Sequence, residues 1–452
     1  MGAWIEHAAA RRPERVALEG PEGTLTYAEL LYEARALERR LVAAGGRRGA
    51  RIAVELAGGL DFVVALHACD LADVAIVPID LRLTEAERGR RRAGAALCIR
   101  GSLGELAAAG DAATQPQRGG LEAADAQPAD ARVLAVMHTS GTTAEPKRIE
   151  LTRGNFLHSA LASAAMLGLD PEERWLCPMP LTHVGGLSIP IRAAIYAVTA
   201  VLHKRFETVA VLAELMDPGR RITLVSLVPT MLQRLLDAGL RRPPTLRYVL
   251  LGGGPIPGGL LERAASAGVP VAPTYGMTEA CSQIATFGLP LPGVEVRVGG
   301  WPAGVPPADG AVAEGEILVR GPVVAPSALG VDGWLHTGDL GQLDERGRLR
   351  VIGRSSETII TGGENVAPAE VEAVLLAHPD VADAAVHGRA DREWGEIVLA
   401  TVVLRDGARV SAEALRAFCS ERLARYKVPK RIAFASSLPR TPSGKLLRRE
   451  LR

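Results

Sequence analysis

The most distinctive polar motif of the chain occupies residues 138–147 and directly follows the apolar run 131–137. Small hydroxylated residues around one glycine can turn many backbone N–H and side-chain O–H groups towards one point, which suits a phosphate chain. The residues concerned are Thr139, Ser140, Gly141, Thr142 and Thr143, with Lys147 as a mobile positive charge. The terminal Gly-Lys-Ser/Thr of a Walker loop is absent. Taken alone, the segment could also be an ordinary polar turn.

Two further clusters offer groups that could contact a nucleotide. Gly252, Gly253 and Gly254 follow an apolar run and would let a planar ligand approach the backbone closely. The stretch Thr274-Tyr275-Gly276-Met277-Thr278-Glu279 combines an aromatic ring, a hydroxyl group and a carboxylate. The ring could stack on a base, the hydroxyl could bind a phosphate oxygen, and the carboxylate could hold Mg²⁺. Each cluster alone is also compatible with a tight surface turn.

The last candidates lie in the final quarter of the chain. Asp339 ends the run Trp-Leu-His-Thr-Gly-Asp, and its carboxylate suits the two hydroxyls of a ribose, where Arg354 could join it. Lys445 follows a glycine near the C-terminus, an arrangement that suits a flexible loop carrying a cation. Without the other motifs, Lys445 would be one more basic residue among Arg440 and Arg448.

Taken together and in this order, the motifs are far more specific than each is alone. They read Thr-Ser-Gly-Thr-Thr…Pro-Lys, Tyr-Gly-Met-Thr-Glu, Thr-Gly-Asp, Gly-Arg, Gly-Gly-Glu-Asn and Pro-Ser-Gly-Lys. The set resembles the acyl-adenylate-forming superfamily of acyl-CoA synthetases, luciferases and peptide-synthetase adenylation domains, and the likeness covers essentially the whole chain. The resemblance implies an enzyme that uses ATP and Mg²⁺ to activate a carboxylic acid, which it then transfers to a thiol such as that of CoA.

The resemblance also implies a role for each motif. Residues 139–143 and Lys147 would hold the β- and γ-phosphates, Thr278 the α-phosphate and Glu279 the metal ion. Tyr275 with the neighbouring Gly276 and the glycine run 252–254 would face the adenine, and Asp339 and Arg354 the ribose. Lys445 would bridge the carboxylate and the α-phosphate during adenylation. A small C-terminal domain would then rotate, withdraw this lysine and present Gly362, Gly363 and Glu364 to the pantetheine arm of CoA.

A narrower resemblance is carried by residues 180–188, 195–206, 250–255 and 275–284. These stretches are similar to the o-succinylbenzoate–CoA ligases of menaquinone biosynthesis, and they vary more within the superfamily than the general motifs do. That resemblance implies an aromatic acid with a second carboxylate on its succinyl arm.

One residue gives a physical hint in the same direction. Arg192 interrupts the apolar run 187–198, which we interpret as a helix lining the acid pocket. A buried arginine requires an anionic partner, since an unpaired buried charge is costly. The hypothesis is that Arg192 meets the non-reacting carboxylate, while His183 and Ser226 shape the site. The alternatives are that Arg192 reaches the surface or pairs with a core carboxylate, and that His183 is a satisfied core histidine.

The elements expected along the chain define an α/β fold. Helical segments alternate with short β-branched runs at residues 51–56, 74–79, 131–137, 223–228 and 246–251, which predicts mostly parallel, helix-covered sheets. Residues 101–130 are interpreted as a loose surface connection. Short strands around 315–360, a helix at 368–377, strands at 381–387 and 397–404 and a helix at 412–423 follow. We therefore expect a large N-terminal AMP-binding domain (1–353) and a small mobile α+β domain (354–452).

Composition narrows the class of protein. The 52 Lys and Arg residues nearly balance the 51 Asp and Glu residues, which gives no support for a nucleic-acid partner. Five scattered cysteines give no disulfide or zinc pattern and favour a reducing compartment. No apolar stretch has the length and freedom from charge of a membrane span. The expected location is the cytoplasm, the expected partners are a carboxylic acid, ATP and CoA, and a homo-oligomer is possible.

Several positions depart from the superfamily pattern. The phosphate loop has Ala144 and Glu145 where glycine and a basic or polar residue are usual, and Arg148 where glycine is common. Ser356 occupies the hinge position that is usually Asp or Lys. Two alternatives therefore stay open beside the succinylbenzoate ligase. One is a ligase for an aryl or fatty acid or a carrier-protein loader, and the other is a non-catalytic nucleotide-binding homologue.

Overall fold

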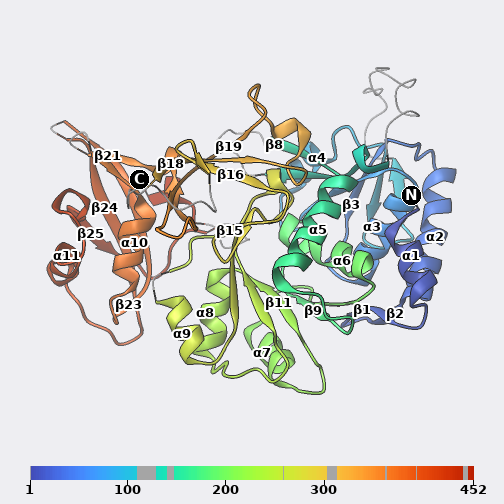
Figure 1. Ribbon diagram of the computed structural model, residues 1–452, viewed down its shortest axis with the longest axis horizontal. Helices are drawn as coiled ribbons and strands as arrows, with labels where there is room; N and C mark the ends of the chain where they lie inside the picture. Colours follow the sequence, from blue (N-terminus) through green and yellow to red (C-terminus); the bar gives the residue numbers. More distant parts are fainter. Residues whose placement is uncertain are drawn as a thin grey trace.

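The computed structural model describes residues 2–108, 129–139, 147–257, 259–302, 313–361, 364–392, 394–440 and 446–451. Within these ranges the backbone forms four sheets. Figure 1 shows the N-terminal part of the chain at one end of the long axis and a small C-terminal unit, coloured orange to red, at the other end. The middle of the chain lies between these two ends, and helices α7 (Thr208–Met216), α8 (Pro229–Asp237) and α9 (Leu260–Ser266) form the bottom of the molecule in this view.

A six-stranded sheet in the order β6-β5-β3-β4-β7-β8 supports the phosphate motif. Its strands are β3 (Arg51–Glu55), β4 (Ala75–Pro78), β5 (Leu97–Arg100), β6 (Leu106–Ala108), β7 (Val133–Thr139) and β8 (Lys147–Thr152). Strands β3, β4, β5 and β7 run parallel, and β6 and β8 close the two edges in antiparallel fashion. Parallel strands buried on both faces are continuous apolar runs, which explains the sequence pattern.

A nine-stranded sheet in the order β15-β14-β13-β12-β11-β9-β10-β1-β2 forms the second layer. Its strands are β1 (Val16–Gly20), β2 (Gly23–Thr26), β9 (Arg174–Cys177), β10 (Thr199–Leu202), β11 (Leu224–Leu227), β12 (Tyr248–Leu251), β13 (Val271–Tyr275), β14 (Ala285–Thr286) and β15 (Leu289–Pro290). The six central strands from β1 to β13 are parallel. The mostly parallel sheets that the alternating pattern predicts are therefore present, and the structure divides the strands between two of them.

Helices cover both sheets. They are α1 (Trp4–Arg11), α2 (Tyr27–Ala43), α3 (Leu60–Leu71), α4 (Glu85–Arg92), α5 (Arg153–Leu167), α6 (Val184–Tyr196), α7 (Thr208–Met216), α8 (Pro229–Asp237) and α9 (Leu260–Ser266). Helix α3 is apolar almost all round and packs between the two sheets, so that it shares one hydrophobic core with α5 and α6. Helices α7, α8 and α9 bury the other face of the nine-stranded sheet.

A third, five-stranded sheet is antiparallel and runs β17-β16-β18-β19-β20. Its strands are β16 (Glu295–Val298), β17 (Trp301–Pro302), β18 (Ala313–Arg320), β19 (Leu335–Leu343) and β20 (Leu349–Arg354). A separate apolar cluster packs this sheet against the end of β13 and the turn that follows it. This sheet therefore carries residues 339 and 354 towards the nine-stranded sheet.

The C-terminal unit has its own core and its own sheet. Strands β21 (Ile359–Thr361), β22 (Glu364–Val366), β23 (Val381–Asp391), β24 (Gly395–Leu404) and β25 (Arg431–Phe434) pack against α10 (Pro368–Leu376) and α11 (Ala412–Ser420). The predicted helices 368–377 and 412–423 correspond to α10 and α11, although α11 ends earlier, at Ser420. The domain boundary at residue 353 stays a prediction.

Two differences from the expected elements have simple causes. The connection 101–130 contains β6, which the alanine-rich composition of that stretch concealed, and a 3-10 turn, η2 (Ala129–Ala131). Because η2 takes up the start of the predicted strand 131–137, β7 begins at Val133. Residues 109–128 lie outside the described part of the chain.

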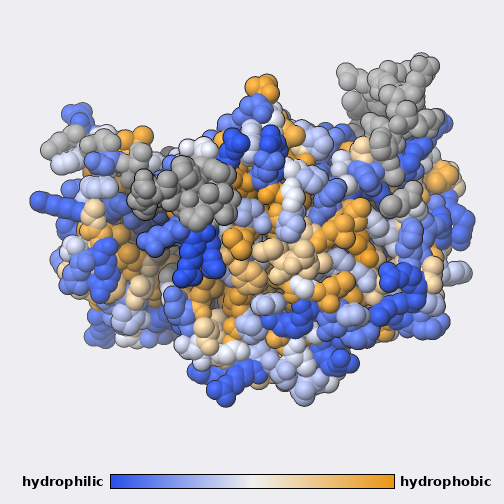
Figure 2. Space-filling view, in the orientation of Figure 1, coloured by the Kyte–Doolittle hydropathy of each residue, from blue (hydrophilic) through white to orange (hydrophobic). Residues whose placement is uncertain are grey.

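Figure 2 shows charged and apolar residues interspersed over one face, with apolar residues gathered near the middle of the molecule. Leu161 of α5, with 54% of its surface exposed, and Leu289 of β15, with 37%, are among the exposed large apolar side chains. Among the described residues, no helix has the length and apolar character needed to cross a bilayer.

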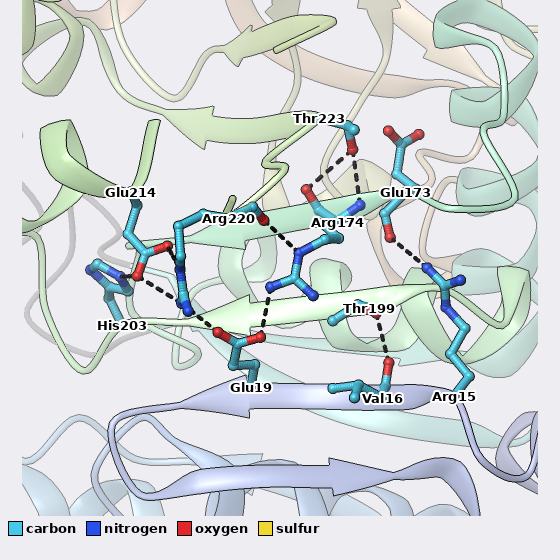
Figure 3. A network of polar contacts seen from close by, with 10 residues as sticks. All are labelled: Arg15, Val16, Glu19, Glu173, Arg174, Thr199, His203, Glu214, Arg220 and Thr223. Carbon is cyan, nitrogen blue, oxygen red and sulfur yellow. Dashed lines mark hydrogen bonds and ion pairs between the residues drawn. The ribbon is translucent and has the colours of Figure 1, made fainter. Parts of the chain in front are cut away.

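A chain of ion pairs fastens strands β1 and β9 of the nine-stranded sheet to α7 (Figure 3). Glu19 of β1 pairs with Arg174 of β9 at 2.6 Å and with Arg220, and Arg220 pairs with Glu214 of α7 at 2.7 Å. His203 approaches Glu214 from the other side. A pocket of about 810 Å³ opens beside the network and is lined by side chains of both signs. Each basic side chain that lines the pocket already faces a carboxylate, so its described lining offers no unpaired cation to a ligand.

This network predicts a loss of stability in acid. Burial raises the pKa of Glu214, but hydrogen bonds from His203 and Arg220 outweigh burial and lower it to about 2. A carboxylate with a depressed pKa stabilises the folded state above its ordinary pKa, and this contribution disappears as the pH falls towards 2. We expect the melting temperature of Glu214→Gln to change less between pH 6 and pH 3 than that of the parent. Glu207→Gln, which removes an exposed partner of Arg205, is the matched control. An equally steep pH profile for Glu214→Gln and the parent would contradict the assignment.

Candidate functional site

The candidate site lies where parallel strands of the nine-stranded sheet end, the usual place for ligands in open α/β sheets. Strands β12 and β13 pair in parallel register, with Leu251 opposite Pro273. Gly252 leaves β12 and Tyr275 ends β13, so the glycine run and the aromatic motif meet at the same edge of the sheet.

Two glycines are required by close packing at this edge. A Cβ at Gly252 would lie 2.7 Å from Cγ2 of Thr274, and a Cβ at Gly276 would lie 1.6 Å from the carbonyl oxygen of Ser282. Any larger residue at position 276 would push apart the turn that carries residues 278 and 279. Gly253 has a φ of +80°, a left-handed conformation that favours glycine. Both glycine motifs therefore have a structural requirement, whatever they bind.

The predicted base-stacking and ribose-binding residues are in direct contact. Tyr275 donates its hydroxyl to Oδ2 of Asp339 at 2.7 Å, and Nε of Arg354 pairs with Oδ1 of Asp339 at 2.7 Å. Asp339 and Arg354 are opposite each other in the antiparallel register of β19 and β20. Burial, followed by the charge of Asp339, raises the pKa of Tyr275, so the phenol remains a donor. The antiparallel sheet is thereby joined to the end of β13.

The predicted metal-binding residue occupies a 3-10 turn, η3 (Thr278–Ala280). Strand β8, which begins at Lys147, packs against this turn. Among the described residues the carboxylate of Glu279 makes no hydrogen bond or ion pair, and it is partly exposed. Nor does this part of the chain contain a cluster of three His, Cys, Asp or Glu side chains. A single available carboxylate fits Mg²⁺, which usually binds one or two carboxylates together with substrate phosphates.

Several predicted site residues lie outside the part of the chain that the structure describes. Ser140, Gly141, Thr142, Thr143, Ala144 and Glu145 of the phosphate motif, Gly362 and Gly363, and Lys445 all lie outside the described residues. The ends of the phosphate motif are described. Thr139 pairs with Lys147 across β7 and β8, and Lys147 is exposed. Arg148, the unusual residue beside it, donates to the carbonyl of Ala93 at 3.2 Å. Glu364 is exposed and starts β22.

The predicted substrate residue Arg192 lies inside α6 and is almost fully buried, with 2% of its surface exposed. Nη2 of Arg192 donates to Oγ of Ser159 at 3.0 Å, and the guanidinium lies 5.5 Å from the ring centroid of Trp175. Its Nε has no partner, and no described carboxylate lies within ion-pair distance. Burial lowers its pKa. Arg192 therefore does not reach the surface, and it has no carboxylate partner in the described part of the chain.

The same cluster includes Ser226 and reaches the turn η3. Nε1 of Trp175 donates to Oγ of Ser226 at 2.9 Å, which brings Ser226 next to the ring beneath Arg192. Ser159 donates to the carbonyl of Cys281 at 2.9 Å, directly after η3. Ser159 therefore links the cluster around Arg192 to the turn that carries Glu279.

Sequence reasoning did not identify Ser159 and Trp175. Ser159 is one of several serines on α5 and belongs to no motif. Trp175 could have been found from strand alternation, since it and Ser226 point to the face of the sheet that α5 and α6 cover, whereas Leu176 points to the other face.

His183 differs from the satisfied core histidine that was considered for it. It is exposed and directly precedes α6, as the N-cap residue. The pKa of His183 is lowered, mainly because the surrounding protein partly desolvates the ring. The charge of Asp80 opposes this shift, and the charge of Arg82 adds to it. His183 is therefore available to a ligand at the start of the helix that carries Arg192.

Comparisons with known proteins identify the family of this chain. The AMP-binding enzyme family model matches residues 5–327, and the model of the AMP-binding enzyme C-terminal domain matches residues 370–445. A 2–succinylbenzoate–CoA ligase of Geobacillus kaustophilus is 40% identical over 100% of this chain and 97% of the relative. The corresponding ligase of Bacillus licheniformis is 38% identical over 99% of this chain and 98% of the relative.

Three solved structures of the o-succinylbenzoate CoA synthetase from Bacillus subtilis are 37% identical to this chain and cover all of it. The complex with the acyl-adenylate intermediate covers 98% of that protein with a TM-score of 0.86, and the complex with ATP and magnesium covers 99% with a TM-score of 0.85. A double mutant bound to a product analogue covers 98% with a TM-score of 0.69. With both family models matched in order and relatives similar along their whole length, the chain belongs to the AMP-binding enzyme family.

Proposed function

We propose that this protein is an ATP-dependent acid–CoA ligase whose acid is 2-succinylbenzoate, an intermediate of menaquinone biosynthesis. The reaction converts the acid, ATP and CoA to acyl-CoA, AMP and pyrophosphate through an acyl-adenylate. The observation that carries the choice of acid is Arg192, a buried positive charge without a carboxylate partner among the described residues. Relatives named 2-succinylbenzoate–CoA ligases support the same choice.

In the first step, an oxygen of the acid's carboxylate attacks the α-phosphorus of ATP and pyrophosphate leaves. Negative charge builds up on the phosphate oxygens, and preorganised donors at that point stabilise the transition state. We assign this task to the loop from Thr139 to Lys147, to Thr278, and to Lys445. A magnesium ion bound through Glu279 would neutralise part of the phosphate charge. Asp339 with Arg354 would hold the ribose, while Tyr275 and the backbone of Gly252 face the adenine.

In the second step, the thiol of CoA attacks the acyl carbonyl and AMP leaves. A carboxylate resists this attack because of its negative charge, whereas the mixed anhydride with AMP has a good leaving group. We propose that the unit from residue 354 onward rotates between the steps and brings Glu364, with Gly362 and Gly363, to the pantetheine channel. The different TM-scores of the adenylate complex and the product-analogue complex of the Bacillus subtilis enzyme support two arrangements of the chain.

The polar cluster around Arg192 supports recognition of a diacid. A buried guanidinium keeps its charge at every physiological pH, so an anionic ligand would supply the partner that the protein lacks there. Ser159 and the ring of Trp175 hold the guanidinium in place, and Ser226 fixes that ring from below. His183, at the N-terminal end of the same helix, would border the site.

The experiment that tests the proposed function is pyrophosphate release with a panel of acids, each with and without CoA. The panel contains 2-succinylbenzoate, benzoate, a medium-chain fatty acid and malonate. We expect the highest kcat/KM with 2-succinylbenzoate, and multiple turnovers only when CoA is present. A higher kcat/KM with one of the other acids would reject the proposed substrate. No release with any acid would favour a non-catalytic nucleotide-binding homologue.

The proposed compartment is the cytoplasm. All five cysteines are unpaired and buried, which is typical of a protein kept in a reducing environment.

A further inference from the structure

The register between strands β18 and β19 shifts at the Thr-Gly-Asp motif. Glu316 of β18 is opposite Leu340 and Leu318 is opposite His336, so β19 advances four residues where β18 advances two. Residues 337–339 therefore form a β-bulge. Bulges next to active sites commonly redirect a side chain, and the side chain at the end of this one is the aspartate of the motif.

Side chains satisfy the backbone N–H groups of the bulge. Gly338, at its centre, has a φ of +66°, a left-handed conformation that favours glycine. Its N–H donates to Oε1 of Glu316 at 3.1 Å, and the N–H of Asp339 donates to Oγ1 of Thr337 at 3.0 Å. Thr337 in turn donates to the carbonyl of Ile317 at 2.7 Å. Two side chains therefore hold the bulge, and one of them, Glu316, lies outside the motif.

The other oxygen of the Glu316 carboxylate faces an imidazole. Nδ1 of His336 lies 3.2 Å from Oε2 of Glu316, and Nε2 of His336 lies 3.0 Å from Oδ2 of Asp332. The carboxylate of Glu316 is thereby fixed between His336 and the N–H of Gly338. Since 38% of this side chain is exposed, its ion pair adds little to the stability of the sheet. The contacts of Glu316 therefore matter mainly for the local conformation of the bulge.

The bulge ends at the predicted ribose ligand. Asp339 accepts the hydroxyl of Tyr275 through Oδ2 and pairs with Nε of Arg354 through Oδ1, both at 2.7 Å. Nη1 of Arg354 also donates to the carbonyl of Thr337 at 3.1 Å. Contacts on both sides of Gly338 thus join the bulge to the candidate site. A change in the backbone conformation at Gly338 would therefore move the carboxylate of Asp339.

We propose that Glu316 is a positioning residue for nucleotide binding, which holds the bulge in the conformation that directs Asp339 towards the ribose. The proposal rests on the proposed function, because it assumes that Asp339 binds the two ribose hydroxyls. Glu316 acts through the backbone of Gly338 and not by contact with the nucleotide. Its loss therefore weakens the contact with the ribose and leaves the contacts with the base and the phosphates unchanged.

Three variants separate this positioning role from a general loss of stability. Glu316→Ala removes the acceptor of the Gly338 N–H. Glu316→Gln keeps a carbonyl oxygen for that N–H and gains an amide that can donate to Nδ1 of His336, so it is the conservative rescue variant. Glu314→Ala is the matched control. Glu314 lies on the same face of β18, opposite Gln342, and accepts from Nε2 of Gln342 at 2.8 Å.

The first measurement needs no nucleotide. Amide hydrogen exchange is followed at single-residue resolution in the peptide that spans residues 330–345, for the parent and the three variants. We expect exchange at Gly338 to accelerate about tenfold or more in Glu316→Ala, less in Glu316→Gln, and not at all in Glu314→Ala. Unchanged exchange at Gly338 in Glu316→Ala would reject the positioning role even if the proposed function is correct.

The second measurement compares two nucleotides. The dissociation constants of ATP and of 2′,3′-dideoxy-ATP, each with magnesium, are measured by calorimetry for the same proteins. We expect Glu316→Ala to weaken the binding of ATP about tenfold and that of dideoxy-ATP less than about twofold, with Glu316→Gln and Glu314→Ala close to the parent. Equal weakening of both nucleotides, or unchanged binding of ATP, would overturn the positioning role. A parent that binds both nucleotides equally well would instead count against the ribose contact that the proposed function assigns to Asp339.

Discussion

Replacement of Lys445 by alanine is expected to reduce adenylate formation by about a hundredfold or more, while supplied acyl-adenylate is still converted to thioester at nearly the parental rate. The attack on the α-phosphorus brings two negatively charged groups together, and a cation between them is worth most in the transition state. Loss of one such preorganised donor typically costs about 10² to 10³ in rate. The thiol step has no such encounter of anions, because the acid's charge is already gone.

The two half-reactions of Lys445→Ala are measured separately, with pyrophosphate release for the first and thioester formation from supplied adenylate for the second. Lys204→Ala is the matched control, since Lys204 is an exposed lysine that pairs with Glu22 away from the candidate site. A comparable decrease in both half-reactions would contradict the proposal that the small unit rotates between the two steps. An unchanged rate of adenylation would show that Lys445 takes no part in that step.

Replacement of Arg192 by methionine is expected to abolish the preference for a diacid. Methionine fills much of the same volume without the charge, so the second carboxylate of 2-succinylbenzoate would enter the pocket unpaired. Loss of one partner of a buried ion pair costs about 3–5 kcal/mol, which corresponds to a factor of roughly 10² to 4 × 10³ in kcat/KM. A monoacid analogue that keeps the reacting carboxyl group and lacks the other should lose far less, because it brings no negative charge to Arg192.

Stability provides an independent check on Arg192→Met. In the ligand-free protein the guanidinium is buried beside Ser159 and Trp175 without a described carboxylate, so its removal should leave the melting temperature equal or higher. A strongly reduced melting temperature would indicate that Arg192 is a structural residue. Retention of the parental ratio of diacid to monoacid kcat/KM would exclude it from recognition.

Local pattern was sufficient to predict the elements that carry the site. The apolar run before residue 138 became β7, the run around Arg192 became α6, and the glycines at 252–254 follow β12 as expected. Each of these signals is contained in a window of about ten residues, where side-chain periodicity and turn residues decide the structure.

The rest depends on pairing between distant parts of the chain. Strand β1 lies beside β10 although about 180 residues separate them in the sequence. Likewise, Asp339 belongs to an antiparallel sheet that is distant in sequence from β13, the strand that ends at Tyr275. Ser159 and Trp175 contact Arg192 only because α5 and β9 are packed against α6. Such neighbours are set by the tertiary fold, so motif and periodicity could not reveal them.

The same reasoning explains why the roles of the site residues remain predictions. Tyr275, Asp339 and Arg354 are brought together, as are Arg192, Trp175 and Ser226, and Ser159 links the second group to η3. Contact shows that these side chains can act on one ligand, but which atoms of the ligand each would touch is a question of chemistry rather than of fold.

Transfer of oxygen from the acid to AMP tests the central claim most directly. 2-Succinylbenzoate labelled with ¹⁸O in both carboxyl groups is incubated with ATP, magnesium and CoA, and the products are analysed by mass spectrometry. If the carboxylate attacks the α-phosphorus, one labelled oxygen must appear in AMP and none in pyrophosphate. Label in inorganic phosphate or pyrophosphate, or formation of ADP, would show that the acid is activated at another phosphorus and would contradict the acyl-adenylate route.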